Sequence, residues 1–169
     1  MAWNGYRHFE CYYAIAGIGA ICHTINPRLY SEQIEFIIQH AEDSIVLVDA
    51  CFLPMLEQIS EKLNCVQPHV VMTDPDTRPD SSLTLLNYEQ LLAEQSDQFN
   101  WPRISEDSAA ALCYTSGTTG NPKGVLYSHR STILHAFASR SADALNVSSS
   151  TVVMPVVPMH HGRPWGLPY

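Results

Sequence analysis

Residues 109–128 read AAALCYTSGTTGNPKGVLYS, and this stretch decides the fold class of the 169-residue chain. It begins with an apolar run, residues 109–114, and ends with a second one, residues 125–128, and each run predicts a β-strand. Between them lies a loop, residues 115–124, that is rich in glycine, threonine and serine. A polar loop that follows a buried strand is a common position for ligand binding in folds that mix helices and sheets.

Strand and helix patterns alternate along the rest of the chain. Apolar residues recur at helical spacing at Ile34, Ile37 and Ile38, whereas short β-branched runs predict buried strands. This order predicts an α/β fold in which a layered, mostly parallel sheet is flanked by helices. The predicted helices are 8–20, 31–41 (with Ser31 as the N-cap), 52–63, 88–95 and 131–145, and the predicted strands are 20–24, 44–48, 69–73, 109–114, 125–128 and 151–157.

The composition argues against two classes of partner. Asp and Glu outnumber Lys and Arg by 17 to 9, which gives a net charge of −8, and no basic cluster is present to neutralise nucleic-acid phosphates. The longest apolar run, residues 14–22, is far shorter than the roughly 20 residues of a transmembrane helix. Charged residues make up only 15% of the chain, which predicts that many of its elements are interior in a larger protein.

Cysteine usage predicts the compartment. The cysteines are odd in number, lack a CxxC pair and lie among apolar residues, so we expect reduced and mostly buried thiols. No basic segment followed by an apolar one precedes them, as a secretory signal would require. We therefore expect a cytoplasmic protein. The five residues are Cys11, Cys22, Cys51, Cys65 and Cys113.

The loop contains the ingredients of a phosphate cradle. Gly117, Gly120 and Gly124 allow backbone N–H groups to approach a ligand closely. Four hydroxyl residues, 115, 116, 118 and 119, add hydrogen-bond donors without charge, and Lys123 supplies a cation. The alternatives are a flexible turn for the loop and a solvated side chain for Lys123.

Two other glycine motifs are excluded by spacing. The nucleotide-hydrolase P-loop requires Gly before its Lys, whereas Lys123 follows Pro122. The dinucleotide fingerprint requires a third glycine, which Gly17-Ile18-Gly19 lacks, so helix packing explains that pair better.

Residues 114–125, YTSGTTGNPKGV, resemble the phosphate-loop signature of the adenylate-forming superfamily, which includes acyl-CoA synthetases, luciferases and adenylation domains of peptide synthetases. The resemblance implies that a carboxylate attacks the α-phosphate of ATP with Mg²⁺, and that coenzyme A then displaces AMP from the acyl-adenylate. It implies that Thr115 also contacts the magnesium ion and that Lys123 clamps phosphate. The implied cofactor-binding residues are Thr115, Ser116, Gly117, Thr118, Thr119, Gly120 and Lys123.

Residues 157–169, VPMHHGRPWGLPY, are similar to a motif of fatty acyl-CoA ligases. The resemblance implies a catalytic position for His161 beside the acyl-adenylate and a substrate-gate role for Trp165. The sequence departs from the motif at three positions: His160 replaces Phe, Arg163 replaces Asn and Pro164 replaces Ala. The alternatives for the adjacent histidines are ordinary packing and a metal site, although no Cys, Asp or Glu lies near them in sequence.

Residues 3–8, 23–29 and 40–43 resemble segments of medium- and long-chain fatty acyl-CoA ligases. The resemblance therefore implies that residues 1–169 are an internal portion of an AMP-binding adenylation domain, truncated at both ends and without the C-terminal domain. The main hypothesis is a fatty acid–CoA ligase, whose isolated 169-residue part we expect to be inactive. The alternatives are a degenerate relative that binds nucleotide or acyl chains, and an adenylating enzyme for another carboxylic acid. A homodimer of the full-length protein is compatible with the resemblance.

Overall fold

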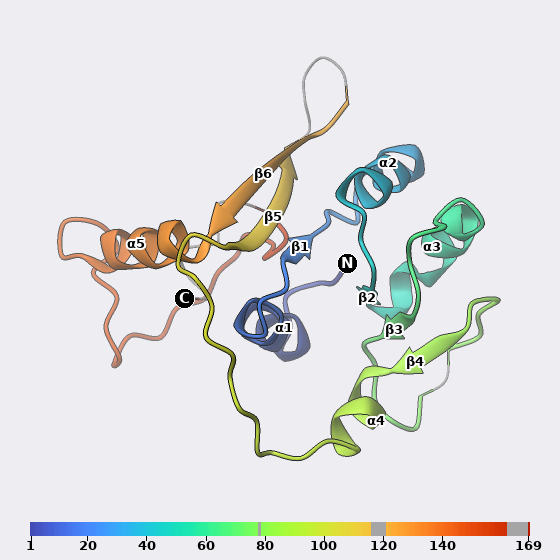
Figure 1. The fold of residues 1–169 in the computed structure, drawn as a ribbon, viewed down its shortest axis with the longest axis horizontal. Coiled ribbons are helices and arrows are strands. Elements are labelled where there is room, and N and C mark those ends of the chain that lie inside the picture. The colour runs from blue at the N-terminus through green and yellow to red at the C-terminus, as the bar shows by residue number, and fades with distance from the viewer. Residues whose placement is uncertain (78, 116–120, 162–168) are drawn as a thin grey trace. The chain divides into compact units, whose positions relative to one another are not determined.

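The computed structural model describes residues 1–77, 79–115, 121–161 and 169 (Figure 1). Helices and strands alternate along much of the chain, and the strand pairs that define its two sheets include parallel ones, which confirms the predicted α/β class. The elements are α1 (Tyr6–Gly17), β1 (Cys22–Thr24), α2 (Ser31–Ala41), β2 (Val46–Val48), η1 (Ala50–Phe52), α3 (Leu53–Ser60), β3 (His69–Val71), β4 (Leu85–Asn87), α4 (Tyr88–Ala93), β5 (Ala109–Thr115), β6 (Lys123–Ser128) and α5 (His129–Arg140).

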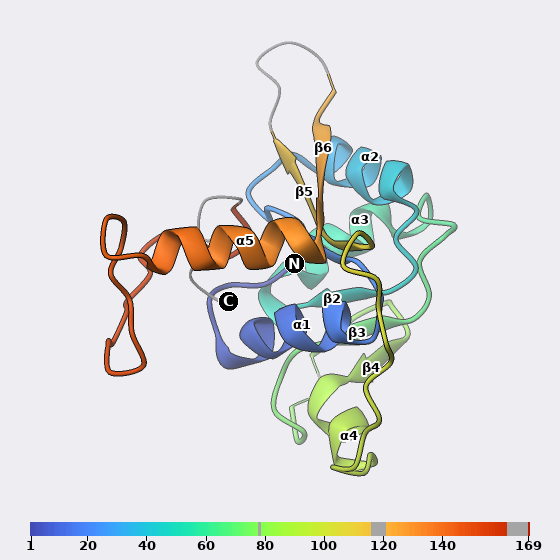
Figure 2. The ribbon, with the colours of Figure 1, turned by 60° about the vertical axis from the view of Figure 1, so that its left-hand side comes forward.

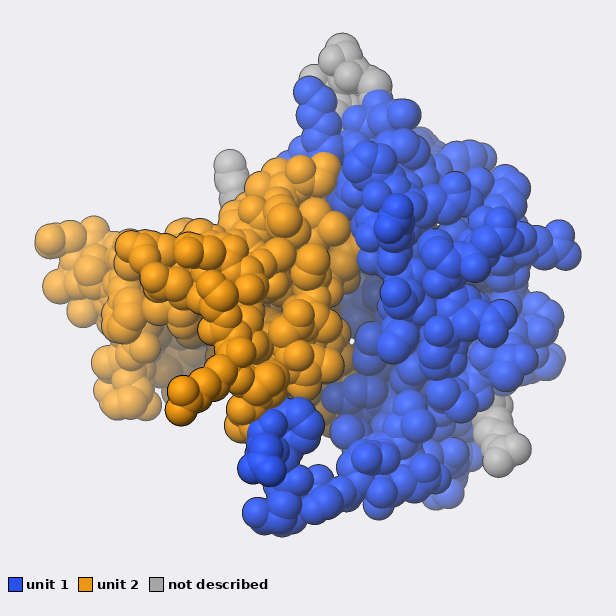
Figure 3. Space-filling model, viewed as in Figure 1, with its two compact units in different colours: residues 1–3, 25–100, 114–123 blue, residues 4–24, 101–113, 124–169 orange. Residues whose placement is uncertain are grey.

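The chain divides into two compact units, which Figure 3 colours separately. Each unit has a hydrophobic core of its own. Unit 1 comprises Met1–Trp3, Ile25–Asn100 and Tyr114–Lys123, and unit 2 comprises Asn4–Thr24, Trp101–Cys113 and Gly124–Tyr169.

Unit 1 contains a parallel sheet in the order β2-β3-β4. Its register pairs Val46 with His69, and His69 with Leu85. β3 is buried along its whole length, as is typical of a central strand in a parallel sheet. Helices α2 and α3 contribute the apolar faces that complete the core. The buried core residues are Ile25, Ile34, Ile37, Ile38, Val46, Val48, Leu53, Leu56, Ile59, Leu63, Val66 and Val71.

Some boundaries in unit 1 differ from the predicted ones. Tyr30, with extended backbone, is the N-cap of α2, so the prediction that Ser31 takes this position is wrong. The predicted helix 52–63 is shorter and is preceded by the 3₁₀ turn η1, while Pro54 occupies the first turn of α3, where its missing N–H costs nothing. The sequence did not predict β4, because three residues show no usable period and only pairing with β3 defines the strand.

Unit 2 is built around a sheet in the order β1-β5-β6. β1 and β5 are parallel, with Cys22 opposite Ala111 and Thr24 opposite Cys113. Figure 2 shows β6 returning beside β5. The buried core of this unit consists of Tyr12, Cys22, Ala111, Cys113 and Met159.

Gly17 lies at the end of α1, where that helix approaches the Trp101 side chain. A Cβ placed on Gly17 would lie 2.5 Å from Cζ3 of Trp101, well inside van der Waals contact. Gly19 has a φ of +85°, a conformation that other residues rarely adopt. Packing explains Gly17, as the sequence predicted, whereas Gly19 lies beyond α1 and is explained by its backbone conformation, which was not predicted.

The predicted strand 151–157 is wrong. The structure has no strand there, and Val152, Met154 and Val156 are almost fully exposed. An apolar β-branched run forms a strand only where a partner supplies hydrogen bonds to its backbone, and the described part of the chain supplies none. The helix predicted to reach residue 145 likewise ends earlier, at Arg140.

Among the described residues, no helix is both long and apolar enough to cross a bilayer. All five cysteines are free thiols. Cys11, Cys22 and Cys113 are buried as expected, whereas Cys51 and Cys65 are exposed.

Candidate functional site

The hairpin of β5 and β6 presents the two ends of the glycine-rich loop. β5 ends at Thr115 and β6 begins at Lys123. The Thr115 hydroxyl lies 3.5 Å from the Lys123 carbonyl oxygen, which is longer than an ordinary O–H···O hydrogen bond. The structure therefore brings together the first and last of the predicted phosphate-binding residues. The predicted residues between them, Ser116, Gly117, Thr118, Thr119 and Gly120, lie outside the described part of the chain.

The burial pattern of β5 explains why its end is available to a ligand. Ala110, Ala111 and Cys113 are buried and hold the strand in place, whereas Thr115 at its end is exposed. On the returning side Pro122 is buried and Lys123 is exposed. The strand thus anchors the hairpin, and the functional groups extend from it into solvent.

The exposed groups at the loop ends fit a polyphosphate. The Lys123 ammonium is a point charge with three donors, and the Thr115 hydroxyl can donate to phosphate or offer its oxygen to a cation. Magnesium in nucleotide sites takes most of its oxygens from phosphates and water, with only one or two from the protein. Thr115 could supply one such oxygen. Within the described ranges, no group of three or more His, Cys, Asp and Glu is arranged to hold a metal.

His161 belongs to unit 2, in a turn where its N–H donates to the Pro158 carbonyl at 3.0 Å. Its side chain is exposed, whereas that of His160 is buried. Burial of His160 places its ring where the ligase motif has an apolar phenylalanine, so an aromatic ring of similar size takes an interior position. The predicted gate residue, Trp165, lies outside the described residues.

Three side chains that sequence reasoning missed hold the segment before His161. Asn4 pairs like a backbone peptide with two residues of this segment: its Nδ2 donates to the Val157 carbonyl at 3.2 Å, and its Oδ1 accepts from the Met159 N–H at 2.6 Å. The Tyr12 hydroxyl donates to the Met159 carbonyl. Thr24, the last residue of β1, donates to the His160 carbonyl at 3.3 Å.

The contact from Thr24 places His160, and His161 directly after it, near the carboxyl end of strand β1. The partners in the four hydrogen bonds are separated by 153, 155, 147 and 136 residues along the chain, so no local pattern could reveal them. The sequence signals were that Asn4 falls in residues 3–8 and Thr24 in residues 23–29, which resemble the ligases without suggesting a role. Side chains and ligands commonly gather beyond the carboxyl ends of parallel strands.

The buried thiols of unit 2 are unsuited to nucleophilic chemistry. Burial, with a smaller contribution from nearby Cys11, raises the pKa of the Cys22 thiol to about 12. Burial also raises the pKa of Cys113, although a hydrogen bond with Tyr127 opposes the shift. Thiols act as nucleophiles only when ionised, so both remain inert packing residues at neutral pH.

Known proteins match this chain along most of its length. The family model described as "AMP-binding enzyme" matches residues 1–167. The chain is 49% identical over 170 residues to a medium-chain-fatty-acid–CoA ligase from Ectopseudomonas oleovorans, covering 100% of this chain and 31% of that ligase. It is 50% identical over 170 residues to a 3-methylmercaptopropionyl-CoA ligase from Ruegeria pomeroyi, covering 100% of this chain and 32% of the relative. The chain thus spans about a third of the length of these curated relatives.

A solved structure supports the fold independently. The red-emitting luciferase from Phrixothrix hirtus aligns with a TM-score of 0.84 at 21% identity, over 99% of this chain and 33% of the luciferase. At that identity the likeness concerns the fold alone. Because the family model covers nearly the whole chain, and two ligases share half of its residues, the chain belongs to the family of AMP-binding enzymes.

Proposed function

We propose that this chain is an internal portion of the adenylation domain of a fatty acid–CoA ligase and binds the phosphates of ATP. The proximity of Thr115 and Lys123 at the two ends of the glycine-rich loop carries the proposal. Both residues are exposed at the end of a buried strand, so a polyanion can reach a hydroxyl and an ammonium together. The ligase from Ectopseudomonas oleovorans, at 49% identity, supports this reaction class.

Each side chain has a defined task in this proposal. Lys123 neutralises charge on the β- and γ-phosphates, and this electrostatic stabilisation increases as pyrophosphate leaves. The Thr115 hydroxyl orients a phosphate oxygen or contributes one ligand to Mg²⁺. Residues 116–120 complete the cradle with backbone N–H groups and hydroxyls. ATP with Mg²⁺, when bound, supplies the electrophilic α-phosphate that the carboxylate attacks.

The second part of the proposal concerns the acyl group and coenzyme A. Asn4, Tyr12 and Thr24 hold the segment that precedes His161. In this proposal His161 lies beside the acyl-adenylate. Trp165 gates the acyl pocket, since a large rigid indole can close a channel and donate one hydrogen bond. The thiol of coenzyme A then attacks the acyl-adenylate, which forms the thioester and releases AMP.

A second candidate is an adenylating enzyme for another carboxylic acid. The relative from Ruegeria pomeroyi is as similar as the medium-chain ligase, at 50% identity, and its name specifies a sulfur-containing short acid. We therefore propose an aliphatic carboxylic acid as the substrate, and a medium- or long-chain fatty acid is the first candidate to test.

A segment exchange tests the reaction. Residues 1–169 replace the matching third of the Ectopseudomonas oleovorans ligase, and thioester formation is followed with ATP, coenzyme A and a panel of fatty and sulfur-containing acids. We expect activity, and Lys123→Ala lowers kcat/KM for ATP by about 10- to 150-fold, the size of a lost charged hydrogen bond.

Lys62→Ala is the matched control. Lys62 is also an exposed lysine of unit 1, but it pairs with Glu35 at 2.9 Å and lies outside the loop. A folded exchange protein that forms no acyl-adenylate with any acid would support the degenerate relative instead. If the two lysine variants changed kcat/KM for ATP equally, Lys123 would have no specific role in phosphate binding.

The proposed compartment is the cytoplasm, which five free thiols fit. Labelling of the protein in fractionated cells tests it. A homodimer of the full-length protein is compatible with the resemblance and is untested, and sedimentation of that protein tests it.

A further inference from the structure

Tyr114, the residue directly before the loop, contacts a side chain of helix α2 within unit 1. Its hydroxyl lies 2.6 Å from Nδ1 of His40, and the two rings meet edge to face at 88° with centroids 5.9 Å apart. We propose that His40 is a positioning residue for the phosphate-binding loop, which holds Tyr114, and through it Thr115, in the geometry that receives the phosphates of ATP. This inference rests on the proposed function of the loop.

His40 is held in place from the helix side. It lies in the last turn of α2, and its ring stacks on that of Phe36, one turn earlier, at 5.2 Å between centroids. An adjoining face of α2 places Ile34, Ile37 and Ile38 in the core of unit 1, almost without exposure to solvent. A side chain presented by such a helix has little freedom to move, which is what a positioning contact requires.

Tyr114 is held from the other side by the same core, against which its ring packs. Burial and the nearby Asp43 carboxylate both raise the pKa of the Tyr114 hydroxyl, so it keeps its proton and can donate at neutral pH. Either His40 accepts this proton at Nδ1 or it donates its own to the phenol oxygen, and both arrangements preserve the bond. The contact therefore does not depend on one tautomer.

The contact reaches the ligand through one peptide bond. Thr115 follows Tyr114, and neighbouring Cα atoms lie about 3.8 Å apart, so a shift of Tyr114 moves the Thr115 hydroxyl directly. That hydroxyl in turn contacts the Lys123 carbonyl across the loop. Loss of the His40 contact thus loosens both ends of the loop, without removing any group that touches phosphate.

Three variants separate the hydrogen bond from ring packing. His40→Phe keeps an aromatic ring on Phe36 but cannot bond to Tyr114, and His40→Asn keeps a polar atom near the position of Nδ1. His, Phe and Asn have similar helix propensities, so α2 itself is little affected. Tyr114→Phe removes the bond from the other partner. His135→Phe, which places the same ring on an exposed position of α5, is the control.

The first measurement is backbone amide hydrogen exchange at residues 114, 115 and 123 in the 169-residue chain. We expect exchange to accelerate about three- to tenfold in His40→Phe and Tyr114→Phe, the size of one lost hydrogen bond, and to recover in His40→Asn. The double variant should show no further acceleration, because both single changes remove the same interaction. Unchanged exchange in His40→Phe overturns the proposal.

The second measurement uses the segment-exchanged ligase. His40→Phe should raise KM for ATP about three- to tenfold and leave KM for the carboxylic acid unchanged, with recovery in His40→Asn. Equal increases in both KM values would mean a general structural role and would also overturn the proposal. If Lys123→Ala leaves ATP use unchanged, the proposed function of the loop fails, while amide exchange still decides whether His40 positions Tyr114.

Discussion

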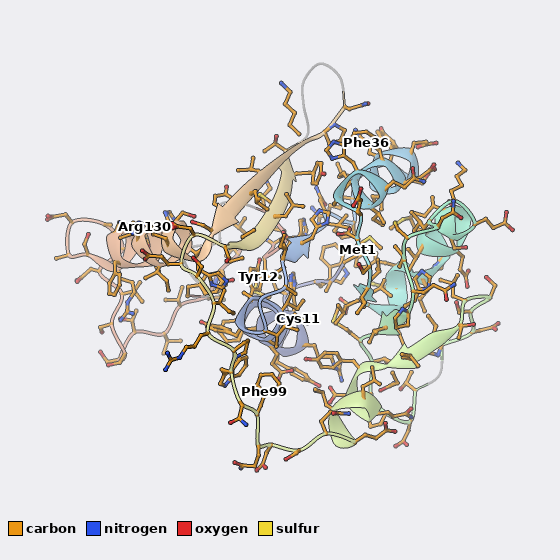
Figure 4. The ribbon with its side chains drawn as sticks, in the orientation of Figure 1. Met1, Cys11, Tyr12, Phe36, Phe99 and Arg130 are labelled. Atoms are coloured by element: carbon orange, nitrogen blue, oxygen red, sulfur yellow. The ribbon has the colours of Figure 1, made fainter. Side chains whose placement is uncertain are left out.

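The hydroxyl of Tyr12 is expected to stabilise unit 2 through one buried hydrogen bond. Tyr12 is fully buried on α1 (Figure 4), and its hydroxyl donates to the Met159 carbonyl. Tyr12→Phe keeps the ring that packs in the core of unit 2 with Cys22 and Cys113. The substitution therefore removes the donor and leaves the shape of the core unchanged.

The cost follows from the burial of both partners. Met159 is only 6% exposed, so its carbonyl loses its hydroxyl partner in a site shielded from solvent. An unsatisfied buried acceptor costs about 1–3 kcal/mol of the free energy of unfolding. A loss of that size accelerates amide exchange about 5- to 150-fold where exchange requires unit 2 to open.

Hydrogen exchange resolves the effect by element. Amides of β1 report unit 2, and amides of β2 and β3 report unit 1. We expect acceleration in β1 and none in β2 or β3. Tyr169→Phe is the control, because its hydroxyl donates to the Tyr12 carbonyl at 3.5 Å, a contact too long to contribute much.

Two results would refute this reasoning. Exchange in β1 within twofold of the wild type would show that the hydroxyl contributes no net stability. Equal acceleration in β1, β2 and β3 would show that the core of unit 2 does not open separately from that of unit 1.

Two further predictions concern the thiols. An aromatic disulfide reagent should modify the exposed Cys51 and Cys65 rapidly in the folded chain, and the three buried thiols only after denaturation. Modification of all five thiols at the same rate in the folded chain would contradict the structure. Alkaline pH should destabilise unit 2 through Cys22, because its pKa is raised from 9.0 to about 12 on folding and only the unfolded thiol ionises between those values. The free energy of unfolding should fall by about 1.4 kcal/mol per pH unit from about pH 9 upward, measured by chemical denaturation in reducing buffer. Subtracting the pH profile of the free energy of unfolding of Cys22→Ala from that of the wild type isolates this contribution. Identical pH profiles for the two proteins would exclude it.

Elements with a clear period were predictable from the sequence. The helix that ends at Ala41 was predicted, with its N-cap one residue late at Ser31 instead of Tyr30, because Ile34, Ile37 and Ile38 recur at helical spacing and bury one face. Elements without a period were not. β4 is only three residues long and is defined by its pairing with β3, whereas the apolar run 151–157 finds no strand partner in the described chain and stays irregular.

The candidate site divides in the same way. The phosphate-binding role of the loop was predicted from residue types, because glycine, hydroxyl and lysine side chains in one short run suit a phosphate, and this role stays a prediction. The side chains that hold the site in place could not be predicted from the sequence. His40 meets Tyr114 across 74 residues, and Asn4 meets Val157 across 153 residues.

The sequence by itself determined the α/β class, the phosphate-loop motif and the resemblance to adenylate-forming enzymes, because these depend on residue types and spacings within short windows. Only the tertiary structure decided that two cores exist, that Tyr12 and Asn4 hold the segment before His161, and that His40 contacts Tyr114. The physical reason is that such contacts arise from parallel strand pairing and helix packing, which bring together residues that no local preference connects.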